Sequence, residues 1–517
     1  MDAALLDGGF KNGFRLGFEG NIGSHVAKNL KSARLNPLLL KEKICKEVRL
    51  GRFAGPYADS PISNLRISPV GLVPKSDGSY RLITHLSYPV GDSVNDGISD
   101  ELSSVTYTSF DSVVGMIFSL GRGAYLAKRD IKSAFRILPI SPLDYCLLGI
   151  KDEEGLIYID KFLPMGCKIS CSLFEKFATF LHWLVSYISG QVTIDHYLDD
   201  FIFCGTKNMQ DCKSLVDTFT MVCGWLTVPL AEEKSVGPVQ KLIFLGYEVD
   251  SVSMSVRIPL HKIDELNAIL LEMLGRKKVT LKEFQTLIGK LAFFSKAVRA
   301  SRAFLRRFYD ATMGIKRSHH KIRLTGDIRQ DMLVWVVFLE EFNGLTYISD
   351  ESWSSNDSLK MFTDSSGSAG LGCGCLLGKE WAYFQWPESW FGNEILRDIT
   401  FLEMVPVLLA LVLWGHKLSN QQIVLYIDNE ALVTIINKQT AKSKRLMQLV
   451  RSFVLLAMQQ GIIFKAKHIP TYANAIADSI SRKQWGRFRT LAPEADALPQ
   501  VIPERFRSWI CDPNLQG

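Results

Sequence analysis

Two adjacent aspartates interrupt an apolar run in the stretch 194-IDHYLDDFIFCG-205. Aspartate favours turns, so Asp199 and Asp200 are expected at the tip of a β-hairpin. A third aspartate, Asp130, ends the apolar strand expected in 124-AYLAKRDIKSAF-135. Carboxylates that converge from separate strands can hold two divalent cations for phosphoryl transfer, and Mg²⁺ prefers such oxygen ligands. These residues therefore indicate a metal site, with an ordinary hairpin turn as the alternative.

A second set of acids follows later in the chain. Asp364 ends the strand expected in MFTDSSG, Asp428 ends the strand expected in LYIDNE, and Asp478 lies in a predicted helix. Glu403 stands beside a long apolar run that is expected to be helical. We predict that this helix begins at Glu403, because Pro406 then falls in the first turn, where proline costs no hydrogen bond. The alternative is that Glu403 only closes a capping box in TFLE.

The segments around the first acids are expected to form strands, loops and one long helix. The segment 66-RISPVGLVPKSDGSYRLITHLSYP-89 is predicted to fold as strand, turn and strand, with SDGS at the tip. A Pro/Gly loop and a long helix are expected in 163–189, and a strand pair in 241-KLIFLGYEVDS-251. Residues 260–340 read as helices. Residues 1–60 form a loosely patterned arm.

A new domain is expected to begin near Leu359. The order of its first elements is β-β-β-α-β-α, followed by a further strand and helix. The chain after Arg482 is rich in proline and is predicted to be extended. The matching segments are SLKMFTDSSG, GLGCGCLLG, EWAYFQWP, LEMVPVLLALVLWG, QIVLYIDNE, ALVTIINK, IIFKAKHIP and ANAIADSISR.

The charge of the chain is concentrated in one region. The 517 residues carry a net charge of +7, but residues 276–329 hold 15 Lys/Arg against 3 Asp/Glu, a local net of +12. Such a region suits a phosphate backbone, and a solvated helix face is the alternative.

The ten cysteines form no CxxC motif and have no His at zinc spacing, which indicates reduced thiols and an intracellular protein, cytoplasmic or nuclear. The longest apolar run, 405–414, is about half of a membrane span, so no membrane is expected.

Five motifs in order give the chain a family resemblance. PKSDGSYRLI, RDIKSAF, LPMG, YLDD and FLGYE resemble reverse transcriptases over roughly residues 60–310. The resemblance implies a right-hand polymerase with Asp130 and Asp199 as metal ligands and Asp200 as the accessory acid. It also implies contacts to the nucleotide and a primer grip. The nucleotide-binding residues would be Lys75, Arg81, Phe135, Met165, Gly166 and Lys234, and the primer grip Phe244, Leu245, Gly246 and Tyr247.

The implied roles differ among these residues. Lys75 and Arg81 would clamp the triphosphate, or else keep an exposed hairpin soluble. Phe135 would act as a steric gate against a 2′-hydroxyl, or else be plain core. Lys234 would donate a proton to the leaving pyrophosphate. Met165 departs from the Gln of many retroviral relatives and cannot donate a hydrogen bond to the nucleotide, although it can pack against it.

The second set of acids carries another resemblance. MFTDSSGSAGLG, FLEMV, LYIDNEA and HIPTYANAIADSISR resemble a ribonuclease H domain. The resemblance implies that four acids hold two Mg²⁺ ions, or Mn²⁺ as a substitute, which activate water against an RNA phosphate. His468 would be a mobile catalytic histidine, or else only the end of a strand. The four acids are Asp364, Glu403, Asp428 and Asp478.

These resemblances define the expected fold. We expect an α+β and α/β multidomain protein, a right-hand polymerase with fingers, palm and thumb followed by a ribonuclease H-like domain. The boundaries are an N-terminal arm (1–60), fingers and palm (61–255), a basic helical thumb (256–345), the ribonuclease H-like domain (355–485) and an extended tail (486–517).

The expected function is that of an RNA-directed DNA polymerase with ribonuclease H activity in a retrotransposon. Its partners would be an RNA template, a DNA primer, the RNA/DNA hybrid and dNTPs, together with recombinase and capsid-like proteins of the same element. The amino-acid sequences of the motifs are similar to those of DIRS-like elements, with gypsy-like LTR elements as the near alternative. A decayed or repurposed protein that binds nucleic acid without catalysis is the competing hypothesis.

Overall fold

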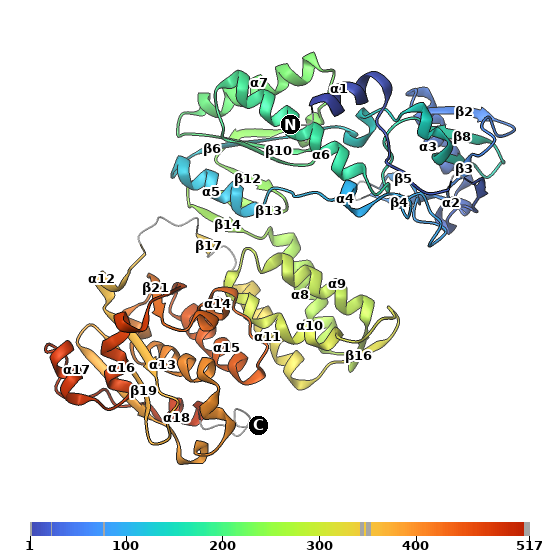
Figure 1. Ribbon diagram of the computed structural model, residues 1–517. Helices are drawn as coiled ribbons and strands as arrows, with labels where there is room; N and C mark the ends of the chain where they lie inside the picture. Colours follow the sequence, from blue (N-terminus) through green and yellow to red (C-terminus); the bar gives the residue numbers. More distant parts are fainter. Residues whose placement is uncertain (1–2, 22, 76–77, 342–345, 348–352, 511–517) are drawn as a thin grey trace. The chain divides into compact units, whose positions relative to one another are not determined.

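The computed structural model describes residues 3–21, 23–75, 78–341, 346–347 and 353–510 (Figure 1). The chain divides into two compact units, Met1–Met254 and Ser255–Gly517. Each unit contains strands and helices, so the mixed fold expected from the sequence is present in both.

The first unit is built around a four-stranded sheet in the order β11-β6-β10-β9. Its strands are β6 (Tyr125–Asp130), β9 (Ile194–Tyr197), β10 (Asp200–Gly205) and β11 (Val236–Val239). The middle of β10, 201-FIFC-204, is fully buried, because helices pack against the sheet on its apolar side chains. The helices that contact the sheet are α5 (Phe110–Leu120), α6 (Ser170–Ser189) and α7 (Met209–Trp225).

A second sheet and two hairpins complete this unit. The sheet has the order β1-β3-β7-β8-β2. Its strands are β1 (His25–Val26), β2 (Phe53–Tyr57), β3 (Arg66–Ile67), β7 (Gly149–Lys151) and β8 (Ile157–Asp160). The hairpins β4 (Val70–Pro74) with β5 (Tyr80–Thr84), and β12 (Lys241–Phe244) with β13 (Tyr247–Asp250), confirm the two strand pairs expected from the sequence. In the SDGS tip, residues 76–77 lie outside the described residues.

The N-terminal segment is part of this unit rather than a loosely patterned arm. It contains α1 (Ala3–Asn12), α2 (Lys31–Arg34) and α3 (Pro37–Arg49). Leu6 and Phe14 belong to the same buried cluster as Phe201 of the central sheet, and Leu40 and Ile44 belong to a second cluster. The expectation of a loosely patterned arm was therefore wrong, because several of its apolar side chains are covered by residues distant in the sequence.

The second unit begins with helices, as expected. They are α8 (Leu260–Leu274), α9 (Leu281–Phe294), α10 (Arg306–Thr312) and α11 (Gly326–Glu341). A capping box between Thr280 and Glu283 fixes the start of α9. Asp331 of α11 is fully buried and forms ion pairs with Arg307 of α10 and with Arg451. Residues 342–345 of the expected thumb lie outside the described residues.

The remainder of the second unit contains an antiparallel sheet and a parallel strand pair. The sheet joins β18 (Met361–Ser365), β19 (Gly372–Leu377) and β20 (Glu380–Gln385). β21 (Gln422–Ile427) pairs in parallel with β22 (Ile463–His468), and β21 contacts β18. The helices are α13 (Ile399–Trp414), α14 (Glu430–Lys438), α15 (Lys444–Gln459) and α16 (Ala475–Ser481). The expected order of elements is present, but α15 was not predicted.

The start of α13 differs from the prediction. Asp398 caps the helix by accepting a hydrogen bond from the backbone of Phe401 at 3.1 Å, so the helix begins at Ile399 rather than at Glu403. Pro406 therefore lies inside the helix and leaves the carbonyl of Leu402 without its usual donor. The helix persists because nearly all of its side chains are buried in the core.

α13 is also the element whose composition resembles a membrane span. Among the described residues, Ile399–Lys417 is the one helical segment long and apolar enough to cross a membrane, and 78% of it is buried inside the protein. A buried core helix passes the same test of length and composition.

The chain after Arg482 is not simply extended. It forms α17 (Trp485–Leu491) and α18 (Glu504–Ile510). Phe488 of α17 joins a buried cluster with Trp381 and Ile480, and Phe506 of α18 packs edge to face on Phe384 with ring centroids 5.4 Å apart. The extended tail was therefore a wrong prediction, because aromatic side chains anchor the segment on β20. Residues 511–517 lie outside the described residues.

Candidate active sites

The first candidate site lies at the end of the central sheet of the first unit. Asp200 pairs with Asp130 across β10 and β6. Leu198 and Asp199 form the turn between β9 and β10, and Leu198 adopts a φ of +54°, which is uncommon for a branched residue. The backbone of Ile131 donates a hydrogen bond to the carbonyl of Asp199 at 3.0 Å, which ties the turn to the end of β6. The structure thus brings the three predicted aspartates together.

The charges of these aspartates are only partly balanced. Lys234 Nζ lies 2.9 Å from Oδ2 of Asp130 and 3.1 Å from Oδ1. Burial and the neighbouring charge of Asp130 raise the pKa of Asp199. Burial, followed by the charges of Asp130 and Asp199, raises the pKa of Asp200 to about 6. The pKa values of Asp199 and Asp200 stay raised although Lys234, Lys128 and Arg81 act to lower them, which is the condition that favours a bound cation.

The predicted nucleotide-binding residues lie on several elements of the same unit. Lys75 and Arg81 are exposed on the β4–β5 hairpin. Phe135 is half-buried and packs edge to face on Phe174 with ring centroids 5.6 Å apart. Met165 is half-buried in the loop before α6.

Among the predicted nucleotide-binding residues, Gly166 is the one at a backbone position that only glycine fits. It has a φ of +99°, and a Cβ there would lie 2.7 Å from the carbonyl oxygen of Thr84. Its own carbonyl accepts a hydrogen bond from Asn95 at 2.8 Å. The loop therefore depends on glycine to approach β5.

The predicted primer grip is a tight hairpin turn with its two aromatic residues facing inward. Leu245 and Gly246 have φ values of +47° and +84°. Phe244 and Tyr247 are fully buried, and Tyr247 packs on Phe110 with ring centroids 4.5 Å apart. Only the two turn residues are therefore partly exposed to solvent.

The second candidate site lies in the second unit. One carboxylate oxygen from each of Asp364, Glu403 and Asp428 lies within 4.8 Å of the others. Asp364 comes from β18, Glu403 from α13, and Asp428 directly follows β21. Ser365 donates a hydrogen bond to Oε1 of Glu403 at 3.0 Å, whereas Oε2 is buried without a partner. An unpaired buried carboxylate oxygen is costly, so this group fits a divalent cation better than an empty core.

The protonation of these acids reflects their burial. Burial and the charges of Asp428 and Asp478 raise the pKa of Asp364 to about 7, although a hydrogen bond from Ser481 acts in the opposite direction. Burial and the charge of Asp364 raise the pKa of Glu403 well above its usual range. Burial also raises the pKa of Asp428. These three buried acids resist being ionised at the same time, and a bound cation would stabilise their ionised forms.

The fourth predicted acid is held differently. Burial acts to raise the pKa of Asp478, but hydrogen bonds from Arg482 and Arg487 outweigh it and lower the pKa. The distances are 2.5 Å from Arg482 Nε and 2.7 Å from Arg487 to the two carboxylate oxygens. Asp478 is therefore already neutralised by arginines. His468 ends β22, is exposed, and has its Nδ1 4.0 Å from Glu430.

Sequence reasoning missed the side chains that support the second site. Ser481 donates a hydrogen bond to Asp364, which lies 117 residues earlier in the chain. Asn474 donates to the carbonyl of Thr363 at 2.9 Å, beside the same strand end. No local signal in the sequence could have joined these residues, because their partners are set by the tertiary fold.

Comparisons with known proteins agree with the geometry of the first unit. Residues 73–249 match the family model described as reverse transcriptase (RNA-dependent DNA polymerase). A search of curated protein sequences finds no match. The DIRS-like and gypsy-like assignments are not addressed by these comparisons.

Solved structures share the fold. One foamy viral protease-reverse transcriptase, described as dRH and in complex with double-stranded DNA, has 16% identity and a TM-score of 0.51, with 87% of this chain and 72% of that chain covered. Another foamy viral protease-reverse transcriptase, also in complex with double-stranded DNA, has 17% identity and a TM-score of 0.51, with 87% and 86% covered. The match of residues 73–249 includes all three aspartates of the first site, and the chain therefore carries a reverse transcriptase domain.

Proposed function

We propose that the protein is an RNA-directed DNA polymerase that also cleaves the RNA strand of RNA/DNA hybrids. The observation that carries the polymerase is the convergence of Asp130, Asp199 and Asp200 inside the segment that matches the reverse transcriptase family. The group formed by Asp364, Glu403 and Asp428 supports the nuclease. Two divalent cations at each site, Mg²⁺ with Mn²⁺ as a substitute, would stabilise the charge of the phosphoryl transition state.

Among the polymerase residues, some would bind the cations or the triphosphate, and one would transfer a proton. Asp130 and Asp199 would hold the cations, and Asp200 would stay partly protonated until they bind, since its pKa is about 6. Lys234, which pairs with Asp130 here, would be released when a cation replaces it and could then donate its proton to pyrophosphate. The exposed Lys75 and Arg81 would contact the triphosphate from the β4–β5 hairpin.

The nuclease residues would hold a water molecule and the scissile phosphate near β18. Asp364, Glu403 and Asp428 would supply the first ligands, since their ligand atoms already lie close together. Asp478 would join them only by giving up hydrogen bonds from Arg482 and Arg487. Recognition of the RNA strand would rest on its 2′-hydroxyls.

The basic region 276–329 would contact the hybrid mainly through phosphates. It spans α9 and α10, and many of its Lys and Arg side chains are exposed, including Lys282 and Arg302. Phosphate contacts release counterions, so the affinity for hybrid should fall steeply as salt rises. An affinity that does not change with salt would contradict this part of the proposal.

The biological setting we propose is replication of a retrotransposon of the DIRS-like type. The competing function is binding of nucleic acid without catalysis. The retention of acids at both candidate sites favours catalysis, because a binding protein has no need for buried carboxylates that resist ionisation.

The first test of the proposal is primer extension on an RNA template with Mg²⁺ and dNTPs. We expect Asp199→Asn to abolish extension, while Asp217→Asn, an exposed acid on α7, leaves it unchanged. Extension that survives in Asp199→Asn would refute the assigned site. Absence of extension in the wild type would favour the binding function.

The second test separates the two activities. We expect Asp364→Asn to abolish cleavage of an RNA/DNA hybrid and to leave extension intact. Glu388→Gln, an exposed acid of the same unit, serves as the control. Cleavage that persists in Asp364→Asn would refute the nuclease assignment.

A further inference from the structure

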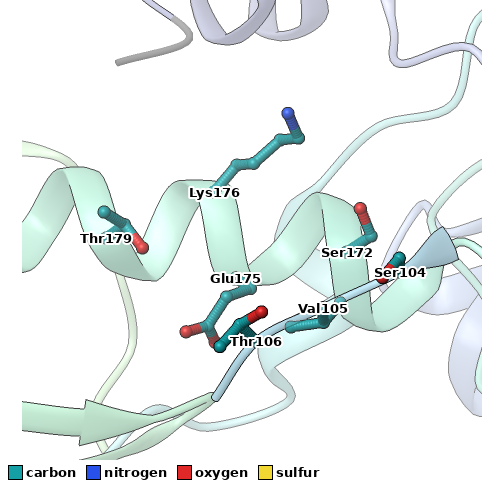
Figure 2. A pocket seen from close by; sticks show the side chains of 7 residues that line it. All are labelled: Ser104, Val105, Thr106, Ser172, Glu175, Lys176 and Thr179. Atoms are coloured by element: carbon teal, nitrogen blue, oxygen red, sulfur yellow. The ribbon is translucent and has the colours of Figure 1, made fainter. Parts of the chain in front are cut away.

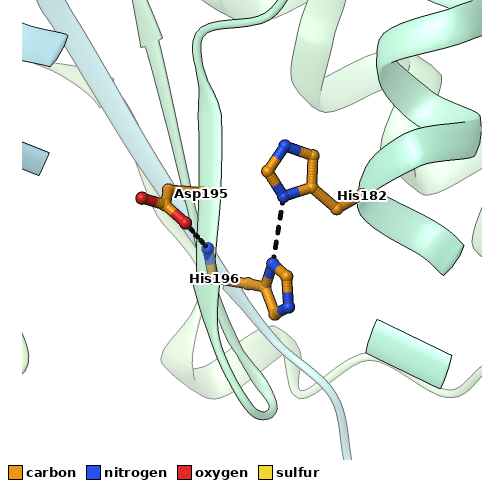
Figure 3. A group of neighbouring side chains, drawn as sticks. All are labelled: His182, Asp195 and His196. Atoms are coloured by element: carbon orange, nitrogen blue, oxygen red, sulfur yellow. Dashed lines mark hydrogen bonds between the residues drawn. The ribbon is translucent and has the colours of Figure 1, made fainter. Parts of the chain in front are cut away.

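A second cluster of possible ligands lies close to the polymerase turn, on β9 and α6. His182 belongs to α6, and His196 belongs to β9, three residues before Asp199. Their Nδ1 atoms face each other at 3.1 Å (Figure 3). One ligand atom from each histidine and one from Asp195 all lie within 4.8 Å of one another. The proposed polymerase mechanism uses none of these side chains.

A buried carboxylate lies at the other edge of the His196 ring. Glu175 Oε1 is 3.2 Å from Nε2 of His196, an ion-pair distance without the alignment of a hydrogen bond. Oε2 of Glu175 is buried and has no hydrogen-bond partner. Histidines that bind metals commonly direct their second ring nitrogen to a carboxylate, as His196 does toward Glu175. A proton on Nε2 would leave the lone pair of Nδ1 facing His182.

The facing nitrogens have nearly the spacing of two ligands on one ion. Nitrogens bound to tetrahedral Zn²⁺ at 2.0–2.1 Å lie about 3.3 Å apart, close to the 3.1 Å found here. Metal ligation requires the neutral imidazole, with the ring proton on the other nitrogen.

The carboxylate of Asp195 is held in place by other residues. Its Oδ1 accepts a hydrogen bond from the backbone of His196 at 2.8 Å. Its Oδ2 accepts hydrogen bonds from Thr108 at 2.6 Å and from Ser112 at 2.9 Å. Such supporting bonds are typical of carboxylates that ligate a metal.

We infer that His182, His196 and Asp195 form a binding site for a transition-metal cation, with Zn²⁺ as the best match. Imidazole nitrogen suits Zn²⁺ and disfavours Mg²⁺, so this site differs chemically from the acidic sites. A pocket of about 340 Å³, lined in part by Glu175, Ser172 and Thr106, reaches the side chain of Glu175 at the Nε2 edge of His196 (Figure 2). A bound ion would tie α6 to the strand that leads into the catalytic turn.

The test is direct measurement of Zn²⁺ binding by the full chain. The protein is stripped with a chelator and titrated with Zn²⁺ in a large excess of Mg²⁺, which competes for any site made of carboxylates alone. We expect one Zn²⁺ per chain in the wild type and a loss of affinity of roughly 100-fold or more in His182→Gln, because losing a residue that only supports a ligand already costs roughly 10–100-fold. His320→Gln, which changes an exposed histidine outside the cluster, should bind like the wild type. No binding by the wild type, or equal binding by His182→Gln, would overturn the inference.

A second measurement needs no variant. X-ray absorption of the Zn²⁺-loaded wild type should show nitrogen and oxygen ligands at about 2.0–2.1 Å with imidazole scattering. A sulfur shell at about 2.3 Å would place the ion on cysteines and would overturn the assignment. Because neither experiment measures polymerisation, their outcome is independent of the proposed function.

Discussion

Neutralising Asp364 should make the metal-free protein less sensitive to pH. Burial and the charges of Asp428 and Asp478 raise the pKa of this carboxyl from 3.8 to about 7. In Asp364→Asn the amide keeps nearly the same shape and can still accept the hydrogen bond from Ser481. The variant therefore removes the charge while changing the packing little.

The size and sign of the effect follow from the two pKa values. In the unfolded chain the carboxyl loses its proton near 3.8, whereas in the folded protein it keeps the proton until about 7. Between these pH values the folded state binds more protons, so stability falls as pH rises. The difference corresponds to about 4 kcal/mol, or roughly a 10³-fold change in the opening equilibrium. This stabilisation is complete below pH 3.8 and is lost once pH passes about 7.

Hydrogen exchange of the β18 and β19 amides in the full chain measures this opening. With chelator present, wild-type protection, corrected for intrinsic exchange, should fall by roughly 10²-fold between about pH 5 and about pH 8, because part of the full change already lies below pH 5. Mg²⁺ should restore it at the higher pH. In Asp364→Asn the decrease should be clearly smaller, with Glu403 and Asp428 supplying what remains, whereas Asp357→Asn, an exposed control, should behave like the wild type. An equal decrease in wild type and Asp364→Asn would refute the reasoning.

Three further predictions follow from local geometry. Gly166→Ala should lower stability by about 1–3 kcal/mol in thermal unfolding, because its Cβ would lie 2.7 Å from Thr84 at a φ of +99°; an unchanged melting temperature would contradict this. Arg487→Ala should shift hybrid cleavage to lower Mg²⁺ concentration, because it removes one of the bonds that neutralise Asp478; an unchanged Mg²⁺ titration would count against that role. Thr280→Ala should lower the free energy of unfolding by about 1 kcal/mol through loss of the capping box, and it should leave primer extension intact. A loss of extension at unchanged stability would show that Thr280 does more than cap α9.

Elements with a strong local signal could be predicted from the sequence. The SDGS turn marked the β4–β5 hairpin, and apolar periodicity marked α8, α9 and α11. An acid that follows an apolar run marked the ends of two strands. Asp130 is the last residue of β6, and Asp364 is the residue before the last of β18. These features depend on neighbours within a few residues, which is why the sequence alone revealed them.

Features decided by distant contacts were missed or predicted wrongly. α13 begins before its expected start and tolerates an internal proline because the surrounding core covers it. α15 is an exception, because it was overlooked although local signals were present: Ser443 caps it, and Leu446, Val450 and Phe453 recur at helical spacing. The arginines on Asp478 and the pairing of His182 with His196 depend on side chains brought together by folding.

The buried carboxylate of Asp331 limits how far the second unit can be divided. Its partners are Arg307, from the helices that precede residue 341, and Arg451, from α15. A fragment that ended at residue 341 would remove Arg451 and leave the fully buried carboxylate of Asp331 with Arg307 alone, and loss of a partner of a buried charge is destabilising. The basic helices and the acid-bearing sheet are therefore poor candidates for separate expression or for exchange between related proteins. An engineer who wishes to replace one of them should first replace Asp331 and both arginines with apolar residues of matching volume.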